Sequence, residues 1–413
     1  MAASWRERRN GGCHTAPRRV STLGGALVGL AVGWNITNVG ALAEPLAEAY
    51  GVGLGVVGLF TTSLFLVHAL VQIPGGRLAD RRGAHPVALA SLAVLAGGSA
   101  LALAAPEPAL AVVGRALAGF GTGAGFVAGS DYVRASGGGT VAQGVFGGSA
   151  MAGGGLALAV VPVLEGPLGW RAAFASSIAV ALLAFVVLLA CPRPAHTRLH
   201  EERASLPDLV GDRRLWRLSA AHMAALGLNA VVANWTVTLL VRGGGFSLSA
   251  AGLVSALTLA GGIVGRPLGG WLARGNPDRA RDVIAVSLVA GMAGTALLLP
   301  AGPAVLVVLA AALVGVGAGL AFAPVFTATA AVRPDAPGAA VGLVNMAANL
   351  VIVFGAPLLG LAFALPGEGR LGFAAVAVLW ACSLLVLPRA SDLGACDVTE
   401  TVQPGTALSR QTR

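Results

Sequence analysis

The chain has 413 residues, of which 56% are hydrophobic and 11% charged, and its mean hydropathy is +0.80. These values exclude a water-soluble globular protein, because a soluble surface of this size needs far more charge. All 27 basic residues are arginines, and with 18 acidic residues they give a net charge of +9. They are spread over separate short segments, which argues against a folded basic face for nucleic acid.

Apolar runs of about twenty residues, long enough to cross roughly 30 Å of hydrocarbon, predict twelve transmembrane helices. In chain order they cover residues 22–43, 54–78, 86–105, 109–132, 141–164 and 168–191, then 215–241, 247–272, 282–300, 304–329, 338–361 and 371–387. The predicted fold class is an all-α membrane protein. We expect a tail at 1–20, a six-helix bundle at 21–191, a central loop at 192–214, a second bundle at 215–388 and a tail at 389–413.

The arginines also predict the orientation in the membrane. Arg171, Arg242 and Arg370 fall beside one end of the spans and Arg115 lies inside a span, which leaves 27 − 3 − 1 = 23 on the other side. The positive-inside rule then places both tails and the central loop in the cytoplasm, in a multi-pass protein of the cytoplasmic (inner) membrane. The four cysteines lie at or near that side without Cys-x-x-Cys spacing, so we expect neither disulfides nor a metal site.

An internal repeat relates the two halves of the chain. The charged segment 76–83 follows the second span, and a related segment at 270–274 returns 270 − 76 = 194 positions later. Glycines at 119, 121, 123 and 125 are answered by glycines at 315, 317 and 319, with an offset of 315 − 119 = 196. Duplication or fusion of a bundle of membrane helices leaves such a trace, so the halves are expected to be pseudo-symmetric.

These motifs resemble the major facilitator superfamily. Its loop pattern Gly-x-Leu-Ala-Asp-Arg-x-Gly-Arg-Arg is matched by Gly76, Leu78, Ala79, Asp80, Arg81 and Gly83, with departures at Ala84 and His85. The family's helix-four arginine with spaced glycines is matched by Arg115 and the glycines after it. The resemblance implies twelve helices in two six-helix bundles and a transporter without a cofactor. Residues 64–74 are more loosely similar to the nitrate/nitrite-porter and cyanate-permease branches.

Asparagines near the middle of the spans are the first candidates for substrate contacts. Asn35 and Asn229 differ by 229 − 35 = 194, the offset of the repeat, so we expect them to face each other. Asn38 shares the face of Asn35, and Asn345 shares a face with Asn349. Amides donate and accept hydrogen bonds without charge, which suits a small polar or anionic solute. The alternative is hydrogen bonding between helices.

Two tryptophans and two ionisable residues lie at similar depth. Trp34 and Trp235 either close a wall of the cavity or fill packing gaps, and packing is favoured. His68 is a candidate for proton coupling, and its alternative is a neutral histidine bonded to a neighbouring helix. Arg115 either attracts an anionic solute or takes part in coupling, and its alternative is structural pairing.

The family resemblance also implies a gate at the charged loop. The loop aspartate of the family engages an arginine at the cytoplasmic end of the fourth helix, which corresponds to Asp80 and Arg134 here. Gly76, Arg81 and Gly83 complete this gating motif. The alternative is that the arginines only enforce topology.

The sequence therefore predicts a secondary active transporter that moves a small anion or polar organic molecule by alternating access, with protons or another ion as candidate coupling partners. The alternative is drug or metabolite efflux by proton antiport. No catalytic residues are expected, because the six histidines are scattered. A chain without lysine contains no Gly-x-x-x-x-Gly-Lys phosphate loop. We expect a monomer in the lipid bilayer.

Overall fold

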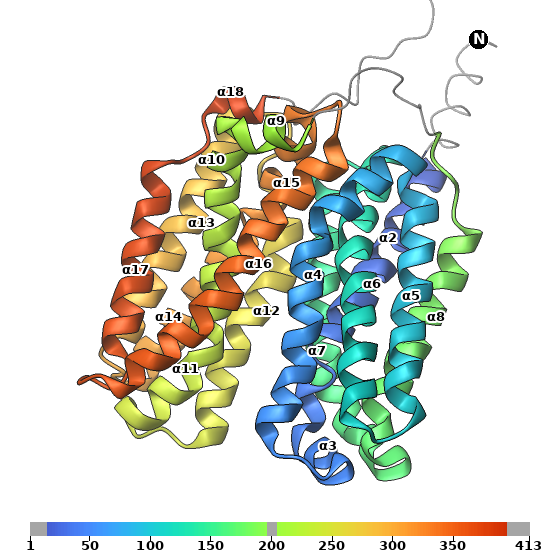
Figure 1. The fold of residues 1–413 in the computed structure, drawn as a ribbon. Helices are drawn as coiled ribbons and strands as arrows, with labels where there is room; N and C mark the ends of the chain where they lie inside the picture. The colour runs from blue at the N-terminus through green and yellow to red at the C-terminus, as the bar shows by residue number, and fades with distance from the viewer. Residues whose placement is uncertain (1–14, 196–204, 395–413) are drawn as a thin grey trace, which may run out of the picture.

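The computed structural model describes residues 15–195 and 205–394, and every regular element in these ranges is a helix (Figure 1). The first half contains α2 (Thr15–Thr37), α3 (Ala43–Tyr50), α4 (Leu54–Arg82), α5 (Ala84–Ala104), α6 (Pro108–Ala135), α7 (Thr140–Leu168) and α8 (Ala172–Ala190). The second contains α9 (Leu206–Gly211), α10 (Arg213–His222), α11 (Asn229–Gly244), α12 (Leu248–Leu272), α13 (Pro277–Leu298), α14 (Ala304–Gly319), α15 (Phe322–Val332), α16 (Pro337–Leu361), α17 (Arg370–Leu385) and α18 (Ala390–Leu393). Short helical turns lie at Gly40–Leu42, Gly169–Arg171, Met223–Leu228 and Ala362–Ala364.

The apolar helices of the described residues agree with the predicted membrane spans. Ten helical stretches are long and apolar enough, and one of them, residues 140–190, contains both α7 and α8. These two helices are joined at Gly169, whose φ of 57° favours glycine, and they pack against each other. α17 is a shorter apolar helix, and counting it and taking α7 and α8 separately gives 10 + 1 + 1 = 12 candidate spans within the described residues. The predicted fold is confirmed.

Helix ends differ from the predicted boundaries where polar residues continue or form a helix. α2 begins inside the expected N-terminal tail, α4 continues past residue 78 to Arg82, and α9 and α18 lie in the expected central loop and C-terminal tail. α9 forms because the Ser205 hydroxyl accepts from the Asp208 main-chain N–H and the Asp208 carboxylate accepts from the Ser205 N–H. A hydropathy scan does not register such polar capping. The rest of the expected tails and loop, 1–14, 196–204 and 395–413, lies outside the described residues.

The helices form two bundles, α2–α8 and α10–α17, that meet along two seams (Figure 1). α4 packs against α16 in one seam, and α7 packs against α12 in the other. Close main-chain approaches pair Gly76 with Gly338, Gly342 with Gln72, Gly144 with Arg266 and Gly270 with Thr140. All of these residues lie in the helix halves nearest Asp80, at the end that carries α9 and α18. We call it the Asp80 end.

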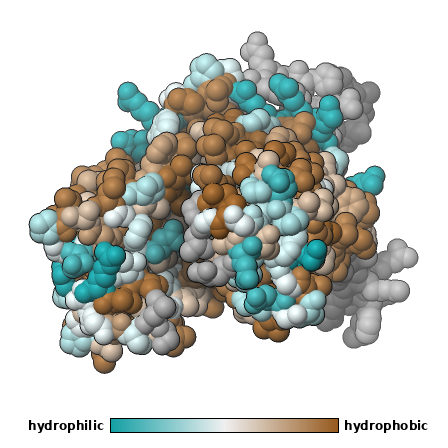
Figure 2. Space-filling model, turned by 60° about the horizontal axis from the view of Figure 1, so that its bottom comes forward, coloured by the Kyte–Doolittle hydropathy of each residue, from teal (hydrophilic) through white to brown (hydrophobic). Residues whose placement is uncertain are grey.

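The bundles separate toward the opposite end of the molecule. A Cβ added at Gly58 on α4, Gly155 on α7 or Gly252 on α12 would meet open space. Figure 2 shows this end as two lobes with a furrow between them. The contact between bundles is therefore concentrated at the Asp80 end, and the space between them opens toward the opposite end.

Close glycine contacts also hold the helices within each bundle, and one of them provides a stability test. A Cβ at Gly98 of α5 would stand 2.5 Å from the Gly114 carbonyl oxygen of α6, whereas at Gly97 it would meet open space. We expect Gly98→Ala to lower the free energy of unfolding by about 1 to 3 kcal/mol, because backbone must move. Gly97→Ala is expected to be neutral or stabilising, since alanine favours helix. Apparent melting temperatures in detergent measure both, and equal destabilisation by the two variants would contradict the packing.

Candidate functional site

The asparagines of α2 face the interior of the first bundle. The Asn38 amide donates to the Ala173 carbonyl (2.9 Å) and the Ser177 hydroxyl (2.6 Å) of α8. The Asn35 amide donates to the Ala31 carbonyl (3.1 Å) of its own helix. Its oxygen accepts from Ser99 of α5 at 3.4 Å. Both side chains are fully buried, so these contacts favour the helix-to-helix alternative.

Arg115 is fully buried and clamps three helices together. Its Nη1 donates to Asn38 Oδ1 (3.2 Å), directly after the end of α2, and its Nη2 to the Asn35 carbonyl (2.8 Å) of α2. Its Nε donates to the Phe60 carbonyl of α4 at 3.3 Å. All three acceptors are neutral, and the guanidinium faces the bundle interior. This arrangement favours structural pairing over contact with a solute.

The remaining expected residues of the first bundle are also paired within it. His68 Nε2 lies 2.8 Å from Gln72 Nε2, which is a donor, so the ring accepts there and its Nδ1 donates to Thr122 Oγ1 at 3.0 Å. This pattern fits a neutral imidazole. Trp34 donates to Ser176 of α8 (3.1 Å). Trp235, the other expected tryptophan, donates to the Ala356 carbonyl of α16 (2.7 Å), so both indoles bridge helices.

The asparagines of the second bundle lie near unpaired polar atoms. Asn229 is buried, and its Oδ1 has no hydrogen-bond partner. No hydrogen bond of the described residues joins it to Asn35, so the structure does not bring the expected pair into contact. Asn345 Oδ1 lies 3.0 Å from His222 Nε2, and Asn349 donates to the Asn345 carbonyl.

A polar and aromatic cluster between the bundles was not expected from the sequence. We call it the Arg266 cluster: Arg266, His222, Asn345, Phe322, Phe326 and Phe126. Arg266 of α12 donates to the Gly147 carbonyl of α7 at 2.7 Å, across the seam, and its guanidinium lies 4.3 Å from the centre of the Phe322 ring. The signal in the sequence was an arginine inside an apolar span with no acidic residue one turn away.

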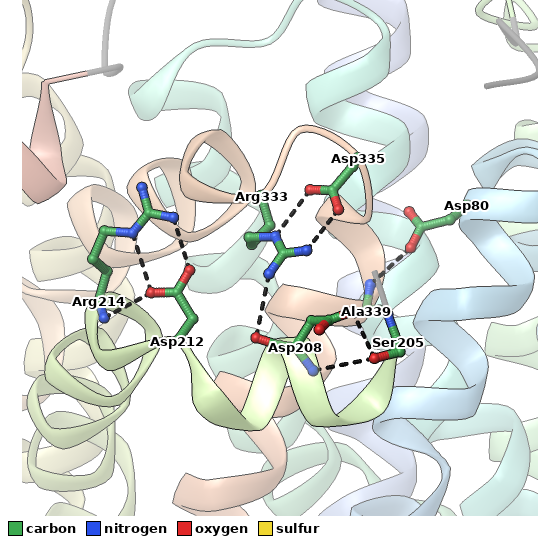
Figure 3. A network of polar contacts seen from close by, with 8 residues as sticks. All are labelled: Asp80, Ser205, Asp208, Asp212, Arg214, Arg333, Asp335 and Ala339. Atoms are coloured by element: carbon green, nitrogen blue, oxygen red, sulfur yellow. Dashed lines mark hydrogen bonds and ion pairs between the residues drawn. The ribbon is translucent and has the colours of Figure 1, made fainter. Parts of the chain in front are cut away.

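At the Asp80 end, the Asp80 carboxylate bridges the two bundles (Figure 3). It accepts hydrogen bonds from the main-chain N–H groups of Gly338 (2.8 Å) and Ala339 (3.0 Å), in the first turn of α16. Arg134 does not form an ion pair with Asp80 among the described residues. It pairs with Asp131 instead, three residues earlier in α6. The expected direct Asp80–Arg134 contact is therefore wrong in this structure, because α6 supplies its own acid within reach.

The other residues of the gating motif shape the seam. Gly76 allows the close approach to Gly338, where a Cβ would collide with the main chain. Gly83 ends α4 at a φ of 91°, a conformation that favours glycine. Arg81 lies in the last turn of α4, where a cation complements the helix dipole.

The connecting helix α9 covers the α4–α16 seam. Leu209 is fully buried in a cluster that contains Ile73 of the first bundle and Ala339 and Leu343 of the second. Arg333 pairs with Asp335 and donates to the Asp208 carbonyl of α9 at 3.3 Å (Figure 3). Hydrogen bonds from Ser205 hold the pKa of Asp208 below its usual range. The Asp80 end is thus closed by a carboxylate, glycine contacts and a helical cover.

Comparisons with known proteins agree with this architecture. The family model described as Major Facilitator Superfamily matches residues 25–356 and 245–393. The chain is 26% identical over 286 residues to a probable sulfoacetate transporter of Cupriavidus necator, and the match covers 62% of this chain and 66% of that relative, slightly under two thirds of its length.

Solved structures show the same fold. The E. coli fucose:proton symporter, solved in the outward conformation, is similar with a TM-score of 0.71 at 16% identity, covering 91% of this chain and 98% of that one. The human organic anion transporter MFSD10 is similar with a TM-score of 0.65 at 15% identity, covering 90% and 99%.

The contacts of Arg115 generate a prediction about stability. Arg115→Lys keeps the charge but cannot reach all three acceptors, so buried carbonyls lose their donors. We expect the free energy of unfolding to fall by about 1 to 3 kcal/mol. Arg171→Lys is the control, because Arg171 is exposed and only lies over Trp170. Melting temperatures in detergent compare the two, and an Arg115→Lys protein as stable as the control would show that the clamp is dispensable.

Proposed function

Because this chain belongs to the major facilitator superfamily, we propose that it carries a small anionic or polar organic solute across the membrane by alternating access. The observation that carries the proposal is that close main-chain contacts join the bundles at the Asp80 end, while a furrow separates them at the opposite end (Figure 2). A site between them is then reachable from the open end, and reversal of the contacts would expose it to the other side. The similarity to a probable sulfoacetate transporter supports an anionic solute.

The closed end supplies the energy difference that alternation has to overcome. Asp80 places a negative charge against two N–H groups at the start of α16, where the helix dipole favours an anion. Such a contact contributes about 0.3 to 2 kcal/mol. That amount is enough to bias two conformations of nearly equal energy without locking either one.

We place the Asp80 end in the cytoplasm. The expected positions of the arginines put 23 of the 27 on that side, together with both ends of the chain and the connecting segment that contains α9. The open furrow then faces the outside of the cytoplasmic membrane. Uptake would begin from this state, and efflux would end in it.

Solute flux is the direct test of the carrier proposal. Purified protein in proteoliposomes should show counterflow, in which unlabelled solute inside accelerates entry of labelled solute, because a carrier exchanges faster than it returns empty. Sulfoacetate, acetate, nitrate, nitrite and cyanate form the first panel, which also tests the loose resemblance to the nitrate and cyanate branches. Flux without exchange acceleration would indicate a channel. An imposed pH gradient then shows whether protons drive uptake or, as in the antiport alternative, efflux.

The Asp80 contact generates a prediction about conformation. Asp80→Asn removes the charge that α16 binds, and should favour opening of the Asp80 end about three- to tenfold. Val341→Cys, buried in the seam in a background without the four native cysteines, reports opening through its rate of maleimide labelling. Asp278→Asn is the matched control, since Asp278 lies in the first turn of α13 and is exposed. Equal labelling rates in both variants would contradict the gate.

A further inference from the structure

We infer that the Arg266 cluster binds the oxyanion head group, a carboxylate or sulfonate, of a small organic anion between the two bundles. Arg266 would supply the charge, and His222 and Asn345 would complete the polar shell. The inference rests on the proposed carrier function and names the part of the solute that the carrier recognises.

Arg266 is a buried cation without a counter-ion. It is 2% exposed, and none of the ion pairs among the described residues includes it. Its Nη1 donates to the Gly147 carbonyl, a neutral acceptor, while its Nε is buried with no partner at all. A guanidinium carries five N–H donors and is costly to bury without an acceptor of negative charge. A bound oxyanion supplies that acceptor.

His222 provides a second unpaired polar atom in the same place. The residue is 1% exposed, and Asn345 Oδ1, an acceptor, fixes the proton on its Nε2. Its Nδ1 is then a buried atom without a partner. The His222 ring lies 5.9 Å from the Phe322 ring, over which Arg266 also lies. Since the proton is on Nε2, Nδ1 is an acceptor, and it would take a hydrogen bond from a hydroxyl or other donor group of the solute while Arg266 contacts the anionic group.

The cluster lies at the depth expected for a transported solute. With a rise of about 1.5 Å per residue, Gly147, His222 and Asn345 stand about 10 to 14 Å from the starts of α7, α10 and α16. Phe322 stands about 15 Å from the end of α15, and the Arg266 main chain stands about 9 Å from the end of α12. These helix ends all lie at the Asp80 end. The middle of a hydrocarbon core roughly 30 Å thick lies about 15 Å from its surface, so the cluster extends from the Asp80 side toward that middle.

The surroundings specify the rest of the solute. Phe126 of the first bundle packs edge-to-face against Phe322 (6.4 Å) and Phe326 (6.0 Å) of the second, so the ring that contacts Arg266 belongs to an aromatic group formed by both bundles. They favour a compact apolar body behind the head group. A single arginine in this shell favours one anionic group bound at a time. Because Arg266 also holds Gly147 across the α7–α12 seam, an anion that replaces this acceptor would loosen the seam.

Direct binding measurements test the inference. Sulfoacetate, acetate and benzoate are titrated into detergent-solubilised full-length protein by calorimetry at constant ionic strength, with benzamide as the neutral control. We expect at least one anion and not benzamide to bind, and Arg266→Gln to weaken that binding at least tenfold. His222→Gln keeps a donor toward Asn345, and we expect it to weaken anion binding less than Arg266→Gln does. The matched control is Arg274→Gln, because Arg274 is exposed at the end of the same span and should leave affinity unchanged.

The outcomes separate the inference from the carrier proposal. If Arg266→Gln does not fold, Arg266→Lys, which keeps the charge without the planar fork, should still bind the anion more weakly than the native protein. Unchanged affinity in either folded variant overturns the inference. The inference is also overturned if the protein binds none of the anions but shows counterflow of a neutral solute. In that case the carrier proposal still holds. Absence of exchange-accelerated flux for every solute removes the carrier proposal itself.

Discussion

A buried polar group in a membrane-embedded bundle has to find its partner inside the protein, because neither water nor lipid supplies one. The first bundle meets this constraint almost completely. Arg115 takes three acceptors, Asn38 takes three partners, and His68 uses both ring nitrogens. In the second bundle Arg266, His222 and Asn229 each retain an atom without a partner. Single atoms without a partner also occur at Gln72 and Ser136 in the first bundle and at Ser219, Thr327 and Trp380 in the second. Unmet hydrogen bonds therefore indicate a site only where several gather around one ring, as those of Arg266 and His222 do at Phe322.

The comparison of two buried arginines shows why charge alone does not identify a site. Arg115 and Arg266 are both fully surrounded and neither has a carboxylate. Arg115 nevertheless donates to acceptors on two neighbouring helices of one bundle, so it acts as a structural clamp. Arg266 donates to the other bundle and keeps its Nε free. What distinguishes them is the direction of the side chain, which depends on helix rotation.

Helix rotation also explains which parts of the structure could be predicted from the sequence. Hydropathy and the repeat offset of 194 were enough for twelve spans in two related halves, because both depend only on position along the chain. The same offset paired Asn35 with Asn229, yet Asn229 follows a π-helical turn, Met223–Leu228. Such a turn inserts an extra residue and rotates the next helix by roughly 100°. The faces of the two repeats then no longer correspond, and only coordinates show where each amide points.

The gate shows the same loss of symmetry, with a mechanical consequence. In the α4–α16 seam, Asp80 binds the N-terminus of the facing helix. In the related α7–α12 seam, the second copy of the loop motif has Arg274 in place of the aspartate. A cation there would be repelled by the N-terminus of the facing helix α7. Arg274 instead bonds back to the Trp271 carbonyl, and that seam closes through Gly270 against Thr140 and through Arg266 against Gly147. One seam is therefore held by a fixed carboxylate and the other by the arginine that we assign to the solute. Occupation of the cluster would replace the Gly147 acceptor in the second seam, so we expect the two bundles to begin to part at α7 and α12 while Asp80 still holds α16.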